Sequence, residues 1–154
     1  MQRLNAHLAA PEVFSAIVQL EKYLEGCGLD RSLLELVKTR ASQINGCAYC
    51  IHMHTRDARS AGESEARLYL LDAWRETDIY TRRERAALAW TEAVTLISET
   101  RAPDELYNEA RVVFSESELV ILTAAIGMIN LWNRMSIAFR AIPQVRNDRH
   151  AVTQ

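Results

Sequence analysis

The scarcity of residues that interrupt helices is the strongest constraint on what this chain can fold into. Its 154 residues include only three prolines and five glycines, and apolar residues recur three and four positions apart along most of its length. That spacing places apolar side chains on one face of an α-helix. No segment shows the alternation of a convincing strand. We therefore predict an all-α fold, a compact bundle of about six to eight helices.

Capping and turn residues divide the chain into segments. Asn45-Gly46 is a typical helix ending, and Ser115 followed three residues later by Glu118 forms a capping box. We expect helices over residues 11–25, 31–45, 47–61, 63–74, 81–100, 104–114 and 115–139. Because no repeat or long linker separates them, residues 1–154 are expected to form a single domain.

Charge and hydropathy exclude several classes of partner. With 20 acidic and 18 basic residues, the chain has no positive surplus for a phosphate backbone, so no nucleic acid is expected to bind. The longest apolar run, residues 119–131, is shorter than the ~20 residues that cross a bilayer and indicates a buried helix rather than a membrane span. Residues 1–5 lack the apolar core of a signal peptide. Three cysteines do not form an even disulfide framework, and a cytoplasmic location is expected.

The informative motif is a pair of cysteines followed by a histidine, Cys47, Cys50 and His54. On a helix these three residues fall within an arc of roughly 60°, whereas His52 points to nearly the opposite side and is expected to have no role. Cysteines in a first helical turn lie near unpaired N–H groups, which favour the thiolate. Such a dithiol can close reversibly to a disulfide. The alternative is two small buried residues that lie close together by chance.

Glu35 is a second candidate, because this carboxylate interrupts the apolar sequence Leu33-Leu34-Glu35-Leu36-Val37. Periodicity allows two interpretations. Glu35 either lies on an exposed stripe of its helix, or it is a partly buried acid–base group that orients His54 or accepts its proton. An antiparallel turn at Asn45-Gly46 would bring Glu35 near the cysteines.

Together these residues fill the pattern Glu-x11-Cys-x2-Cys-x3-His with Glu35, Cys47, Cys50 and His54. The pattern resembles that of the carboxymuconolactone decarboxylase superfamily and, within it, of the AhpD-like alkylhydroperoxidases. Residues 45–50 and 83–88 are also typical of that family, and the resemblance extends over roughly residues 12–100. Relatives with the same Cys-Ala-Tyr-Cys sequence often carry an acidic residue at the position of His52.

The resemblance implies a thiol-dependent hydroperoxide reductase. In the family's mechanism, Cys50 attacks the peroxide and becomes a sulfenic acid, Cys47 supplies a proton and then resolves it as a disulfide, and Glu35 with His54 relays the proton. An external dithiol, a lipoyl-bearing protein in the best-known members, reduces the disulfide. No metal and no tightly bound cofactor are implied. The family's trimers and hexamers suggest a homo-oligomer.

Three alternatives remain open at this stage. The dithiol is a non-catalytic redox sensor in the first. In the second, Cys47, Cys50 and His54, with His52 or Glu35, bind zinc. The third is lactone decarboxylation, although members with that activity lack the paired cysteines.

Several other residues are expected to be structural. Cys27 is interpreted as a space-filling residue. Core or subunit contacts are expected for Trp74, Trp90 and Trp132. Paired interface or capping roles are expected for the polar interruptions Asn130, Asn133 and Arg134. The terminal histidines His7 and His150 are expected to face the solvent.

Overall fold

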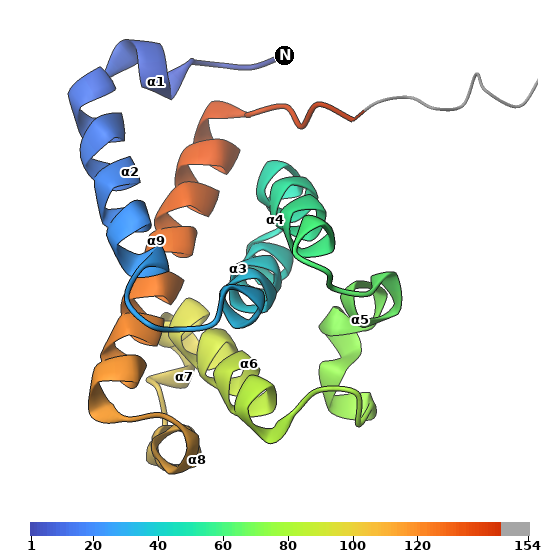
Figure 1. The fold of residues 1–154 in the computed structure, drawn as a ribbon. Coiled ribbons are helices and arrows are strands. Elements are labelled where there is room, and N and C mark those ends of the chain that lie inside the picture. Colours follow the sequence, from blue (N-terminus) through green and yellow to red (C-terminus); the bar gives the residue numbers. More distant parts are fainter. Residues whose placement is uncertain (146–154) are drawn as a thin grey trace, which may run out of the picture.

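Helices make up the architecture of residues 1–145, the part of the chain that this computed structural model describes (Figure 1). In order they are α1 (Ala6–Ala9), α2 (Pro11–Glu25), α3 (Arg31–Asn45), α4 (Ala48–Ser60), α5 (Glu65–Tyr69), the 3-10 helix η1 (Leu71–Glu76), α6 (Arg82–Thr95), α7 (Ile97–Thr100), α8 (Asp104–Val113) and α9 (Glu116–Phe139). Within those residues there is no strand, and the all-α prediction is confirmed. There are ten segments in this part of the chain rather than the six to eight expected. The four-residue helix α1 was not expected, the helix expected over 81–100 divides into α6 and the four-residue α7, and the segment expected over 63–74 divides into α5 and η1.

The helix ends follow local signals. Thr81 and Ser115 each form a capping box that begins a helix, α6 and α9 respectively. Gly46 ends α3 with φ of 69°, a left-handed conformation that glycine adopts without strain. Asp30 is the N-cap residue of α3, but its side chain makes no capping hydrogen bond.

Helix α3 lies at the centre of the fold, between α4, α6 and α9 (Figure 1). Because neighbours cover it on most sides, its polar residues are buried together with its apolar ones. The buried polar residues of α3 are Glu35, Lys38, Thr39 and Ser42. This burial matters for function, since a polar group removed from water requires a partner inside the protein.

Two large apolar clusters form the core on either side of α3. One joins α3, α6, α8 and α9 around Leu122 and Ile126, and the other joins α3 to η1 and α6 around Leu71 and Leu88. Each fully buried leucine contributes about 2 kcal/mol to stability. A third, smaller cluster contains Cys47 and Cys50. The dithiol is therefore supported on rigid, close-packed helices.

Helix α9 is long and apolar enough, by length and composition alone, to cross a membrane. The whole helix has 24 residues, in agreement with the helix expected over residues 115–139, and extends beyond the apolar run of residues 119–131 at both ends. In the fold α9 packs against α2, α3 and α6. It contributes Leu122, Ile126 and Ile129 to the interior, as expected for a core helix.

The residues assigned structural roles are mostly found in such roles. Trp74 and Trp90 are buried in the core, whereas Trp132 is half-buried. The Cys27 thiol donates to the Tyr23 carbonyl oxygen at 2.9 Å. His7 is exposed, as expected. His150 lies outside the described residues.

Candidate active site

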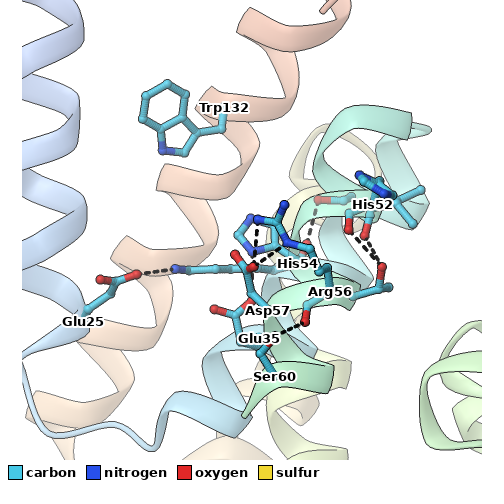
Figure 2. Close-up of polar contacts among 12 residues, drawn as sticks. Glu25, Glu35, His52, His54, Arg56, Asp57, Ser60 and Trp132 are labelled. Atoms are coloured by element: carbon cyan, nitrogen blue, oxygen red, sulfur yellow. Dashed lines mark hydrogen bonds and ion pairs between the residues drawn. The ribbon is translucent and has the colours of Figure 1, made fainter. Parts of the chain in front are cut away.

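The turn at Gly46 folds α4 back against α3 and brings Glu35 to His54. The Glu35 Oε2 and His54 Nδ1 atoms lie 2.9 Å apart, and each residue is 5% exposed. Figure 2 shows the two side chains pointing toward one another from adjacent helices. Glu35 therefore does not lie on an exposed stripe, and its buried carboxylate has the histidine as its partner.

The second ring nitrogen of His54 has no such partner. Nε2 is buried and makes no hydrogen bond with any described residue. Since Nδ1 is held by the carboxylate, Nε2 is the atom of this ring that is free to accept or donate a proton. A buried polar atom without a partner is unfavourable by about 1–3 kcal/mol. This nitrogen is therefore suited to binding a small polar group such as a water molecule or a substrate oxygen.

Both cysteines are free thiols at the N-terminal end of α4, and each is 1% exposed. Cys47 is the N-cap residue, and its Sγ accepts a hydrogen bond from the backbone N–H of Cys50 at 3.3 Å. The Cys50 Sγ and Ser136 Oγ atoms lie 3.7 Å apart, with Ser136 on α9. His54 follows Cys50 by one helical turn, so it faces the same side of α4 as the two sulfurs.

The two sulfurs have opposite electrostatic environments. A hydrogen bond from the Cys50 thiol, helped by the Cys50 backbone N–H against the effect of burial, lowers the pKa of Cys47 to about 6. The pKa of Cys50 is raised above its usual range, first by this same hydrogen bond to Cys47 and then by burial. The pair thus shares one proton near neutral pH, with the negative charge on Cys47. The resemblance assigned the attack to Cys50, which is the protonated member of the resting pair.

Two residues of α9 complete the surroundings of the dithiol and were not assigned to it from the sequence. Ser136 lies within hydrogen-bond distance of Cys50, and Ser136 and Asn133 lower the pKa of both thiols by hydrogen bonding. Asn133 is fully buried; it accepts from Asn45 at 2.8 Å and donates to Ser42 Oγ at 3.0 Å. The only available sequence signal was the presence of polar residues three apart in an apolar helix.

His52 is excluded from this arrangement. It lies on the far side of α4 from His54 (Figure 2) and is half-buried there. Among residues 1–145, no three His, Cys, Asp or Glu side chains are grouped so that they could hold a metal ion. The zinc alternative therefore has no ligand set in this part of the chain.

A second buried polar network lies beside the first. Lys38 on α3 forms ion pairs with Glu21 at 2.5 Å and Glu25 at 3.3 Å, both on α2. Burial opposes the charge of Lys38, but the hydrogen bond and charge of Glu21 prevail and raise its pKa. Glu21 also accepts from the indole N–H of Trp132 at 2.7 Å. Trp132 packs against the cluster that contains the cysteines, so this network positions one of the walls around the dithiol.

A cavity of about 380 Å³ is lined by Ser136, whose Oγ lies 3.7 Å from the buried Cys50 sulfur. Tyr49 also lines it, and the other walls are mostly apolar and aromatic. This volume is near the lower end of the roughly 300–1,000 Å³ of small-molecule sites. A larger cavity of about 1190 Å³ lies between η1, α6 and α8 and is lined by none of the four candidate residues.

This fold, with a buried dithiol beside a His–Glu pair, is that of the AhpD-like proteins. A crystal structure from Agrobacterium tumefaciens, of a protein of unknown function suggested to be the antioxidant defence protein AhpD, is 46% identical and superimposes with a TM-score of 0.92 over 94% of this chain and 99% of that one. The profile of the Carboxymuconolactone decarboxylase family matches residues 11–93. The chain belongs to this family.

Two further comparisons show the range of relatives. The uncharacterized protein YdfG of Bacillus subtilis is 47% identical over 89% of this chain and 93% of its own length. The debrominase Bmp8 is only 20% identical, and its TM-score of 0.78 over 89% of this chain and 74% of that one shows a shared fold alone. Membership among the AhpD-like proteins supports an antioxidant or peroxidase-related function.

Proposed function

We propose that this protein reduces hydroperoxides with the dithiol of Cys47 and Cys50 and moves the protons through His54 and Glu35. The observation that carries this proposal is the buried, unpartnered Nε2 of His54 on the same side of α4 as two free thiols. Its other nitrogen is held by Glu35 at 2.9 Å. Such a pair is suited to general acid–base catalysis, because the carboxylate orients the ring and stabilises its protonated form.

The first step begins from the two cysteines, which share one proton. The second proton of the cycle is supplied by His54. Ser136 lines the cavity and lies 3.7 Å from the Cys50 sulfur. Cys50 passes its proton to Cys47, and its sulfur attacks the distal oxygen of the hydroperoxide. The O–O bond breaks, the leaving alkoxide takes the proton from Cys47, and an alcohol is released. Cys50 is then a sulfenic acid and Cys47 is a thiolate.

The second step closes the disulfide. The Cys47 thiolate attacks the Cys50 sulfur, the S–O bond breaks, and the departing hydroxide takes the proton from His54 to form water. One hydroperoxide, one thiol, one thiolate and the proton from His54 thus become one alcohol, one water and one disulfide. An external dithiol must return two electrons before the next cycle. We propose that the protein is cytoplasmic, that a dithiol of the lipoyl type reduces it, and that it forms a homo-oligomer, as the family resemblance implies.

Steady-state turnover of hydroperoxide with dihydrolipoamide as the reductant tests this proposal. Cys50→Ser is expected to abolish consumption, Cys47→Ser to allow one oxidation without recycling, and His52→Ala to keep most of the activity. Full turnover by Cys50→Ser would refute the assignment of the attacking sulfur.

Thiol counting separates the enzyme from a sensor. One equivalent of hydroperoxide is expected to remove two of the three free thiols, and dihydrolipoamide is expected to restore them with continued consumption. A single stoichiometric oxidation without turnover would instead support the sensor.

A further inference from the structure

Much of the wall of the cavity that Ser136 lines lies outside the part of the chain that the family profile matches. These walls include residues 2 and 4–7 and several residues near the C-terminal end of α9, whereas Phe14 and Tyr49 lie within the matched residues 11–93. The N-terminal wall therefore lies outside the profile match that contains the dithiol.

This N-terminal wall, defined as residues 2–7, is tied to the end of α9. The Arg3 backbone N–H donates to the Phe139 carbonyl oxygen at 2.9 Å, and the Arg3 guanidinium donates to the Ala138 carbonyl oxygen at 3.1 Å. Figure 1 shows the first residues of the chain beside the C-terminal end of α9. Two bonds to main-chain acceptors hold the segment in one position over the cavity.

Aromatic rings connect the N-terminal wall to the dithiol. The His7 ring contacts Phe14 edge to face at 4.9 Å between centroids, and Phe14 contacts Trp132 in the same way at 5.0 Å. Trp132 is fixed by its hydrogen bond to Glu21 and packs against the cluster of Cys47 and Cys50. Edge-to-face contacts of this kind are worth about 0.5–1.5 kcal/mol each beyond the area they bury.

We propose that residues 2–7 form a specificity-determining wall that selects hydroperoxides carrying a compact aromatic group over hydrogen peroxide. This inference rests on the proposed hydroperoxide reductase function. An aryl group in the cavity contacts the edges and faces of His7, Phe14 and Trp132, while its peroxide oxygens reach Ser136, which lies 3.7 Å from the Cys50 sulfur. Hydrogen peroxide has no group that reaches the N-terminal wall, so it gains nothing from these rings.

The kinetic test compares cumene hydroperoxide with hydrogen peroxide in the full-length protein. Arg3→Ala releases the N-terminal wall and His7→Ala removes its ring, and each is expected to lower the ratio of kcat/KM for cumene hydroperoxide to kcat/KM for hydrogen peroxide by about tenfold. Gln19→Ala, an exposed position on α2, is the matched control and is expected to leave the ratio unchanged. An unchanged ratio in both Arg3→Ala and His7→Ala would overturn the proposal.

A binding test keeps this proposal separate from the proposed function. 2-Phenyl-2-propanol carries the same aryl group without a peroxide bond, and its binding is followed through tryptophan fluorescence, with Trp132→Phe identifying the signal. We expect saturable binding that weakens about tenfold in His7→Ala. Binding without any peroxide turnover would support the aryl site and refute the reductase. Turnover of both peroxides without binding of the alcohol would refute the aryl site alone.

Discussion

The charge on Cys47 can be tested by removing the thiol that stabilises it. In a Cys27→Ala parent, the remaining thiols are Cys47 and Cys50. At pH 7 a thiol with a pKa of about 6 is about 90% ionised, compared with about 1% at the ordinary value of 9.0. Cys50→Ala removes the largest contribution to this lowering but keeps the backbone N–H of residue 50 and the helix terminus. We therefore expect a thiolate fraction at pH 7 reduced between about 10-fold and 90-fold.

The assay is the pH dependence of alkylation by iodoacetamide. The rate of the parent should rise with pH through a midpoint near 6, and the midpoint of Cys50→Ala should lie well above it. The midpoint is a better measure than the rate, because a thiolate of higher pKa is intrinsically more nucleophilic and recovers part of the loss. Cys50→Ser, whose hydroxyl can still donate, is the matched control with an intermediate midpoint. Identical midpoints for Cys50→Ala and the parent would refute the shared-proton interpretation.

Substitutions of Glu35, Lys38 and Asn133 test the buried polar groups around the dithiol. Glu35→Gln keeps a hydrogen-bonding partner for the histidine but removes the charge, so peroxide turnover should fall about a hundredfold with little change in thermal unfolding; an unfolded product would mark Glu35 as structural. Lys38→Met leaves Glu21 without its cation and should lower the free energy of unfolding in urea by about 3 kcal/mol. Adding Glu21→Gln should recover more than half of that loss, and equal instability of the two variants would show that the ion pair is not its cause. Asn133→Ala should destabilise the fold by about 2 kcal/mol and raise the alkylation midpoint of Cys47; an unchanged midpoint would remove Asn133 from the thiolate's surroundings.

Most of the fold could be predicted because helix formation depends on neighbours within a few residues. The capping boxes at Thr81 and Ser115 and the glycine at position 46 act through adjacent backbone groups, and all three are found as helix ends. The short helix α1, the break at Leu96 between α6 and α7, and the break between α5 and η1 were missed, since four to six residues carry too little periodicity to detect.

The site could be predicted only in part. Periodicity left Glu35 either exposed or buried, and its burial follows from the position of α3 between three other helices. Ser136 is separated from Cys50 by 86 residues, and Arg3 from Ala138 by 135. No local pattern relates residues so far apart. His7 was correctly expected to be exposed, but its contact with the cavity could not be foreseen.

The sequence alone determined that Cys47, Cys50 and His54 share one face, because the period of an α-helix is a property of its own backbone. Tertiary structure decided which sulfur carries the charge, which nitrogen of His54 is free, and which rings enclose the cavity. These depend on electrostatic and packing contacts between α3, α4, α9 and the N-terminal segment, which exist only once the helices have assembled.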